Sequence, residues 1–276
     1  MKHYVFLTCM SIILALTSCY RDSEDVVSVN DKYVTFNFNL AGVEHSSLTR
    51  AISEPSNLLI IDKFGDEVTS DTKTSLAPFS LPLDYGRHEI YFVAADKIWT
   101  SYSTAEWKVE WPSSHDGLSY VWAAHLTLDV DEDTSVEDIT LPLIIANVQV
   151  KTLDKIPATA SSLHIDAPDL CKGLDLLTLS GIPTDTPVNY SLDLSRGTGN
   201  TLRINLFTFV PPTSCIGDIS LTVLDQNTQE IAAKTLNEVP VQPGYISLYA
   251  GYLFSDGISF PLSYTDDWSG THSYGF

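Results

Sequence analysis

Basic residues are scarce in this chain of 276 residues, which has 15 lysines and arginines against 35 aspartates and glutamates. The formal net charge of −20 gives a surface that repels phosphate groups, so binding to nucleic acid or to anionic headgroups through basic patches is disfavoured. A cationic partner remains an open alternative. The charge excess does not indicate disorder, because 44% of the residues are hydrophobic and aromatic residues occur along the whole chain.

Long apolar runs are missing too. The run near the N-terminus, residues 5–16, is too short to cross a membrane as a helix, which takes about 20 residues. It is followed by Ser18, Cys19 and an acidic stretch. This pattern predicts a bacterial lipoprotein signal peptide, residues 1–18, whose removal leaves a lipid-carrying Cys19 as the first residue of a flexible acidic tether, residues 19–30. The alternative is an ordinary secretory signal that happens to contain Cys19.

Cysteine is also rare, with four in the chain. Cys9 leaves with the signal peptide and Cys19 carries lipid, so Cys171 and Cys215 remain for the folded part. Export places these two in oxidising surroundings, where they either form one disulfide or stay as two buried thiols that behave as small hydrophobic side chains. Neither cysteine belongs to a close-spaced ligand motif, so no metal site is expected at them.

No window of the sequence has a helical apolar stripe over three turns. Apolar residues instead recur at every second position in short runs separated by Gly, Pro, Asn, Asp and Ser, which is typical of β-strands. One such run comprises Val34, Phe36, Phe38 and Leu40, and a continuous apolar run at residues 58–61 predicts a fully buried strand. The chain is therefore expected to be all-β.

The number and spacing of these strands favour two consecutive β-sandwich domains over a single barrel. The acidic loop at residues 129–138 and the strand after it form the expected seam. The predicted domains are residues 31–145 and residues 146–276.

Recognisable metal-binding motifs are lacking. Asp129, Asp131 and Asp133 have the spacing that begins a calcium loop, but Thr134 stands where the loop needs glycine and Thr140 where a bidentate glutamate should close it. A solvated charged turn is therefore expected here rather than a weak calcium site.

Catalytic motifs are lacking as well. No serine lies at a glycine-flanked strained turn, no histidine pair has metal-ligand spacing, and Gly197 and Gly199 do not open a helix after a strand. No enzyme activity and no cofactor are expected, and histidines such as His88 are expected at surface or edge positions.

Four of the five tryptophans crowd one half of the chain: Trp99, Trp107, Trp111 and Trp122. Large aromatic side chains fill cores and rims, and they also stack on sugars. We interpret these four mainly as packing residues, and a patch that binds a carbohydrate or a partner protein is the alternative.

Several segments, taken together, resemble the fimbrillin-like subunits of Bacteroidales, the stalk, anchor and tip proteins of type V pili. The acidic stretch after Cys19 resembles the surface-export signal of Bacteroidetes lipoproteins. The stretch before residue 146, where members of the family commonly have a basic residue, contains Ile144 and Ile145, so the subclass stays open. The segments that carry the resemblance are residues 49–51, 58–65, 83–95, 146–150, 154–157, 207–211, 239–242, 245–254 and 266–270.

The resemblance implies two transthyretin-like Greek-key β-sandwiches and assembly with other pilus subunits by donor-strand exchange. An arginine-directed protease would cut the bond between Arg50 and Ala51 and release an N-terminal strand, which the C-terminal segment of a neighbouring subunit would replace. The displaced strand would carry Val34, Phe36, Phe38 and Leu40, and the donor strand would be either residues 268–276 or the run containing Ile258, Phe260, Leu262 and Tyr264.

On this hypothesis the protein is a structural fimbrial subunit that supports adhesion at the cell surface, held in the outer membrane by lipid on Cys19. Each feature also has an ordinary explanation, since residues 33–40 can be a permanent first strand and Arg50 a simple loop residue. The alternative function is a surface lipoprotein that does not polymerise and whose tryptophan-rich half binds a glycan or a host protein.

Overall fold

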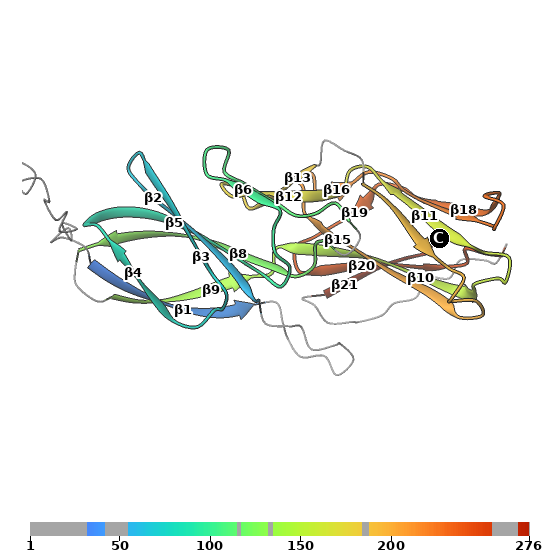
Figure 1. Ribbon diagram of the computed structural model, residues 1–276, viewed down its shortest axis with the longest axis horizontal. Helices are drawn as coiled ribbons and strands as arrows, with labels where there is room; N and C mark the ends of the chain where they lie inside the picture. The colour runs from blue at the N-terminus through green and yellow to red at the C-terminus, as the bar shows by residue number, and fades with distance from the viewer. Residues whose placement is uncertain are drawn as a thin grey trace, which may run out of the picture.

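The structure is a computed structural model that describes residues 32–41, 55–114, 117–131, 135–183, 188–255 and 270–275. All of the regular elements in these ranges are β-strands (Figure 1), so the all-β prediction is confirmed. In the same ranges no helix is long and apolar enough to cross a membrane. The predicted lipidation residue Cys19, the Arg50–Ala51 bond and the apolar run from Ile258 to Tyr264 lie outside the described residues.

The strands are numbered in chain order. The first nine are β1 (Lys32–Ala41), β2 (Asn57–Phe64), β3 (Glu67–Lys73), β4 (Phe79–Leu83), β5 (Gly86–Ala95), β6 (Ser101–Ser103), β7 (Lys108–Glu110), β8 (Val121–Val130) and β9 (Ser135–Pro142). The others are β10 (Ile145–Lys155), β11 (Ser162–Ala167), β12 (Cys171–Asp175), β13 (Ser180–Pro183), β14 (Val188–Asp193), β15 (Thr201–Phe209), β16 (Cys215–Ile216), β17 (Ile219–Leu224), β18 (Glu230–Leu236), β19 (Val239–Pro240), β20 (Tyr245–Gly251) and β21 (Gly270–Gly275).

The first half of the chain forms two sheets, with strand orders β4-β1-β9 and β3-β2-β5-β8. Inward residues of both sheets belong to one hydrophobic cluster, among them Phe36 of β1, Ile60 of β2 and Phe92 of β5. The period of two in the sequence places these residues on the facing surfaces, because successive side chains of a strand point to opposite sides.

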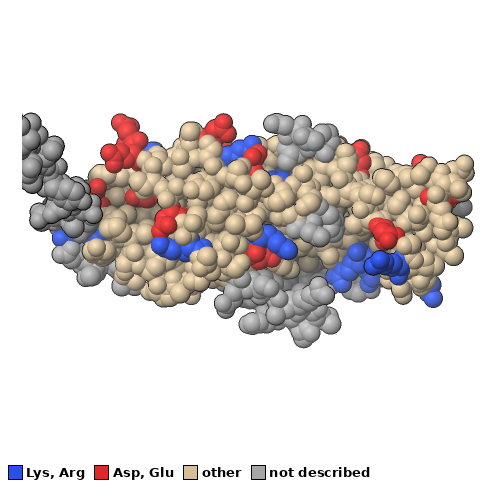
Figure 2. All heavy atoms as spheres, viewed as in Figure 1, with Lys and Arg blue, Asp and Glu red and all other residues tan. Residues whose placement is uncertain are grey.

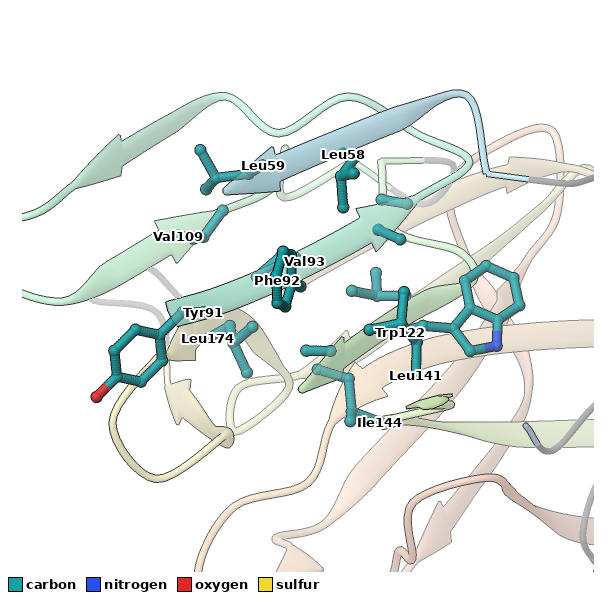
Figure 3. Packing of buried hydrophobic residues seen from close by; sticks show 14 of the residues in the cluster. Leu58, Leu59, Tyr91, Phe92, Val93, Val109, Trp122, Leu141, Ile144 and Leu174 are labelled. Carbon is teal, nitrogen blue, oxygen red and sulfur yellow. The ribbon is translucent and has the colours of Figure 1, made fainter. Parts of the chain in front are cut away.

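Residues 58–61 of β2 are buried on both faces of their sheet, as their continuous apolar run predicts. Ile60 is in register with Phe92 of β5 and shares its face, which packs against Phe36 of the other sheet. Leu59 is in register with Val93 of β5 and shares the opposite face. That second face is covered as well, since Leu59 and Val93 belong to the same cluster as Val109 of β7 (Figure 3). A strand covered on both sides has no position left for a polar side chain.

The second half forms a large sheet, ordered β21-β20-β10-β15-β12-β7-β6 with β13 beside β12, and a four-stranded sheet ordered β14-β11-β17-β18. The short strands β6 and β7 come from the first half of the sequence, yet they extend the large sheet (Figure 1). Gly173 of β12 is in register with Glu110 of β7, and Trp111 N donates to Lys172 O at 2.9 Å. Backbone pairing therefore joins the two halves.

The buried apolar residues form two clusters, and the boundary between the clusters falls within β10. Ile145 belongs to the first cluster and Ala146 to the second. The first cluster also takes in Phe209 and Leu248 from the second half of the chain. The division into domains 31–145 and 146–276 stays a prediction. On the face shown in Figure 2, lysines and arginines occur in small groups beside acidic residues.

Candidate functional site

The first strand, β1, is the central strand of its sheet. It runs parallel to β9, with residues 34–41 in register with residues 135–142. It runs antiparallel to β4 over a shorter distance, from the Lys32–Leu83 pair to the Phe36–Phe79 pair. From residue 37 onward β1 therefore has β9 as its partner strand in this sheet, and β4 has ended.

The four residues predicted for a displaced strand all contact the core. Val34 and Phe36 are fully buried, and Phe38 and Leu40 are partly buried against the same cluster. Burial of a large apolar side chain contributes about 1.5–3 kcal/mol. The alternation of the sequence accounts for this placement, whereas the exchange of this strand stays a prediction.

Phe36 and Phe38 are held by two aromatic rings from neighbouring strands. The Phe36 ring centroid lies 5.9 Å from that of Phe79 in β4 and 5.4 Å from that of Phe92 in β5. The Phe38 ring stacks on Phe79 at 5.6 Å and meets Phe92 edge-on at 5.2 Å. These tilted, stacked and edge-on geometries are the favourable ones for aromatic pairs. We call Phe79 and Phe92 the aromatic clamp.

The outward side of β1 makes polar contacts that are exposed to solvent. The hydroxyl oxygens of Thr35 and Ser80 lie 2.9 Å apart, and Asn37 Nδ2 donates to Asp138 Oδ1 at 3.2 Å. Exposed polar pairs contribute little free energy because water competes for both partners. These polar pairs favour one register, whereas the apolar side chains of β1, including the two rings in the aromatic clamp, bury the surface that stabilises the strand.

Removal of β1 would leave the facing edges of β4 and β9 without their shared partner. Between those edges the clamp rings and the rest of the cluster would be uncovered. Unpaired strand edges beside an apolar surface are a template for addition of another strand. We call this vacated space between β4 and β9 the β1 slot.

The end of the chain also takes part in a sheet. β21 pairs in parallel with β20, from the Tyr245–Gly270 pair to the Ala250–Gly275 pair, and stands at the edge of the large sheet. β21 contains residues 270–275 of the predicted donor segment 268–276.

The two remaining cysteines are free thiols, so the disulfide alternative is not realised in the structure. Each sulfur has its own backbone acceptor: Cys171 Sγ lies 3.7 Å from Asp169 O, and Cys215 Sγ lies 3.4 Å from Ile216 O. Burial, reinforced by the charge of Asp169, raises the pKa of the Cys171 thiol to about 12. Cys171 therefore behaves as a small hydrophobic residue.

The tryptophans of the first half are packing residues. Trp122 and Trp111 are buried, and Trp99 and Trp107 are partly buried against the same cluster. The Trp111 ring lies 5.1 Å from that of Phe209 in β15, so it joins residues of the two halves. These contacts favour the packing interpretation over a sugar-binding patch.

His88 of β5 is buried, so the expectation of a surface histidine is wrong. Its Nδ1 lies 2.9 Å from Asp62 Oδ1, and its Nε2 lies 2.9 Å from Asp84 O. Burial raises the pKa of Asp62, and the contact with His88 opposes that shift. The sequence contains the signal for this placement, because His88 is in phase with Ile90 and Phe92, which face the core.

Lys172 of β12 is a buried amine that sequence inspection misses. Its Nζ donates to Phe207 O at 2.8 Å and lies 5.8 Å from the centroid of the Tyr190 ring. Burial lowers the pKa of Lys172 to about 7. Within the described ranges, no group of three or more side chains could hold a metal ion.

No protein-family model and no curated protein matches the chain. The fold matches a candidate adhesin of Bacteroides ovatus ATCC 8483, with a TM-score of 0.57 and 11% identity over 81% of this chain and 89% of that chain. A candidate polysaccharide-binding protein of Bacteroides thetaiotaomicron VPI-5482 gives a TM-score of 0.51 and 9% identity over 75% of this chain and 80% of that chain. The fimbrial anchor protein Mfa2 of Porphyromonas gingivalis gives a TM-score of 0.46 and 15% identity over 75% and 83%. The chain therefore shares its fold with the two Bacteroides proteins.

Proposed function

We propose that this protein is a structural subunit of a surface fibre of the type V pilus kind. It is exported as a lipoprotein through Cys19 and assembles with other subunits by exchange of a β-strand. The observation that carries the proposal is the position of β1 between β4 and β9, at the centre of its sheet. Because β1 precedes every other described strand, one cut in the connection that follows it separates it from the rest of the fold.

The shared fold supports an adhesive rather than a catalytic role, since one of the matching proteins is described as a candidate adhesin. The proposal includes two consecutive transthyretin-like Greek-key domains, a lipid anchor in the outer membrane and exposure at the cell surface. Its partners are other pilus subunits, of this or a related chain. No step of it requires a cofactor.

The proposed assembly begins with a cut between Arg50 and Ala51, downstream of β1. Release of β1 breaks two strand ladders and uncovers the aromatic clamp, so the trimmed subunit exposes apolar surface and unpaired edges. A strand from a neighbouring subunit pairs with the free edges and covers the apolar surface again. Because the donor end and the acceptor slot are different surfaces, the contact does not close on itself and the product is a fibre.

An arginine-specific protease tests this proposal. Cleavage of the mature protein is expected to give a stable fragment that begins at Ala51, followed by polymers that elute early in size-exclusion chromatography. Arg50→Ala is expected to stay monomeric, and Arg50→Lys treated with a lysine-specific protease is expected to recover polymerisation. Polymers from Arg50→Ala at the wild-type rate would contradict the processing step.

The alternative, a surface protein that binds a glycan and does not polymerise, has less support. The tryptophans on which it depends are committed to packing at the junction between the halves. A glycan array with the wild-type protein tests this alternative directly. The alternative predicts that the protein binds glycans on the array and does not polymerise after cleavage.

A further inference from the structure

We propose that Lys172 is a protonation lock on the junction between the two halves of the chain: its neutral amine keeps strand β7 attached to β12, and uptake of a proton releases β7. The lock works within one subunit and does not depend on strand exchange. The buried amine and one of the backbone contacts that join the halves belong to the same residue, because Lys172 Nζ donates to Phe207 O while Lys172 O accepts from Trp111 N.

The attachment of β7 to the large sheet is small. Three residue pairs join β7 to β12. At one end of this ladder Trp111 N donates to Lys172 O at 2.9 Å. At the other end Leu176 N donates to Trp107 O at 2.8 Å. We call these contacts the β7 seam. A ladder this short is expected to open while the rest of the protein stays folded, because few hydrogen bonds break together.

Lys172 is the extra residue of a β-bulge. The pairing of β12 with β13 shifts by one residue between Cys171 and Gly173. Cys171 and Leu174 therefore both belong to the first hydrophobic cluster, although residues three positions apart point to opposite sides of a regular strand. The side chain of Lys172 points the other way, toward the Tyr190 ring of β14.

The amine has few neighbours that stabilise a charge. Its Nζ donates to Phe207 O at 2.8 Å and lies 5.8 Å from the centroid of the Tyr190 ring. An ammonium group carries three N–H donors, and burial of its charge is costly without an anion or further acceptors. Burial lowers the pKa of Lys172 to about 7, and among the described residues no charged group contributes to this shift.

The charged side chains of the adjoining strands have other partners. On β7, Lys108 Nζ lies 2.6 Å from Glu110 Oε1. On β15, Arg203 Nη2 donates to Gln149 Oε1 at 2.8 Å. On β12 itself, the carboxylate of Asp175 accepts from backbone N–H groups of the turn that follows. Strand β13 carries no titratable side chain.

The remaining titratable groups near the amine leave it without a counter-ion. Burial raises the pKa of Tyr190 and of the Cys171 thiol, so both are neutral at pH 7. The charge of Asp169 acts on Cys171 and does not contribute to the pKa of Lys172. Asp193 of β14 accepts from the backbone of the loop after it. A proton on the amine therefore creates an unpaired charge behind the β7 seam.

Protonation and seam opening are linked through the backbone of residue 172. A charged amine gains free energy by reaching water, and Lys172 reaches the surface when it turns to the other side of its strand. That turn moves the carbonyl oxygen that receives Trp111 N. The bulged and the regular register of β12 are two discrete arrangements, and the neutral amine favours the bulged one.

The direction of the pH effect follows from the pKa of the amine in each state. With the seam closed it is about 7, and for a lysine in water it is about 10.4. Between these values opening takes up a proton, so the equilibrium constant for opening rises roughly tenfold for each unit by which the pH falls. Below pH 7 both states hold the proton and the constant levels off. The two halves are thus held together in alkaline solution and jointed at neutral pH and below.

Hydrogen exchange of the seam amides tests the lock. The readout is the protection factor, which corrects for the intrinsic effect of pH on exchange, for residues 107–111 and for residues 146–150 of β10. In the wild-type protein we expect the protection of residues 107–111 to fall roughly tenfold per unit as the pH is lowered from 9 to 7. In Lys172→Met it is expected to stay within about twofold over the same range. The β10 amides are expected to be better protected than the seam at every pH.

Three further variants complete the test. Lys234→Met removes an exposed lysine from β18 and is expected to keep the wild-type pH dependence. Lys172→Gln is a second neutral variant and is expected to behave as Lys172→Met does. Lys172→Arg keeps its charge at every pH, so its seam is expected to be as poorly protected at pH 9 as the wild-type seam is at pH 7.

Two results would overturn the lock. The first is a pH dependence of seam protection that survives in both Lys172→Met and Lys172→Gln. The second is equal protection of residues 107–111 and 146–150 at every pH, because β7 would then open only when the whole protein unfolds. Neither result bears on the proposed strand exchange, which is measured by polymer formation after cleavage.

Discussion

His88 Nδ1 lies 2.9 Å from Asp62 Oδ1 inside the first pair of sheets, and the Nε2 of the same ring faces the carbonyl oxygen of Asp84 at 2.9 Å. A carbonyl oxygen only accepts, so Nε2 must carry a proton. Nδ1 then either donates to the Asp62 carboxylate or accepts from its protonated form. The bond to Asp84 ties the turn between β4 and β5 to β5.

We expect His88→Ala to destabilise the protein by about 2–4 kcal/mol, because it leaves the half-buried Asp62 without its partner and opens a cavity. His125→Ala is the matched control, since His125 is exposed on the neighbouring strand β8, and its cost should stay below about 0.5 kcal/mol. Urea denaturation followed by fluorescence measures both. An equal loss of unfolding free energy in the two variants would show that the pair of His88 and Asp62 contributes nothing to stability.

Lys172 should make stability depend on pH. Its pKa is about 7 in the folded protein and near 10.4 in an unfolded chain, so between these values the unfolded state binds more protons. Stability should therefore rise with pH across this window, by up to about 1.4 kcal/mol per pH unit. Below pH 7 both states are protonated and the full cost of burying the charge applies.

The variant Lys172→Met tests this origin, since it keeps a long apolar side chain without the amine. We expect it to be more stable than wild type at pH 7 and to lack the rise between pH 7 and 10. Lys234→Met is a control on the exposed part of strand β18. If the stability of Lys172→Met rises with pH in parallel with that of wild type, a group other than Lys172 causes the pH dependence.

Trp111 should stabilise the junction between the two halves of the chain. It is buried, its Nε1 donates to Lys97 O at 3.1 Å, and its ring packs on Phe209. Trp111→Ala is expected to cost about 3–5 kcal/mol, as truncation of a buried aromatic residue usually does. Calorimetry is the appropriate measurement, because loosening of the junction would also broaden or split the transition.

Trp111→Phe serves as the partner variant, since it keeps an aromatic ring against Phe209 and loses the hydrogen bond. Its cost should be clearly smaller than that of Trp111→Ala. If both variants unfold at the wild-type temperature and instead lose glycan binding on an array, Trp111 belongs to a binding surface and the packing account is wrong.

Much of the first pair of sheets was predictable from the sequence for a local reason. The alternation of Val34, Phe36 and Phe38 indicates both the strand and the side that it buries, and the unbroken run at residues 58–61 indicates a strand covered on both faces. The same reasoning applied to His88 would have placed it inside, since it shares the phase of Ile90. The expectation of a surface position for His88 did not use this phase, and it was wrong.

Other features depend on contacts between distant parts of the chain, and these have no local signature. Strands β6 and β7 are three residues long each, too short to show a period, and the pairing of β7 with β12 could not be predicted from residues 101–110. The same holds for the aromatic clamp, because Phe79 stands in a segment interrupted by Pro82. The burial of Lys172 could not be predicted from the sequence either, since a lysine on a strand is normally expected to face water.

The central claim is that β1 is an exchangeable strand. Native mass spectrometry of the protein after cleavage at Arg50 tests it most directly, because it weighs each assembly with its retained fragments. The account predicts multimers built from chains that begin at Ala51, with the fragment containing β1 released. Monomers that keep the β1 fragment bound at high protein concentration would contradict it.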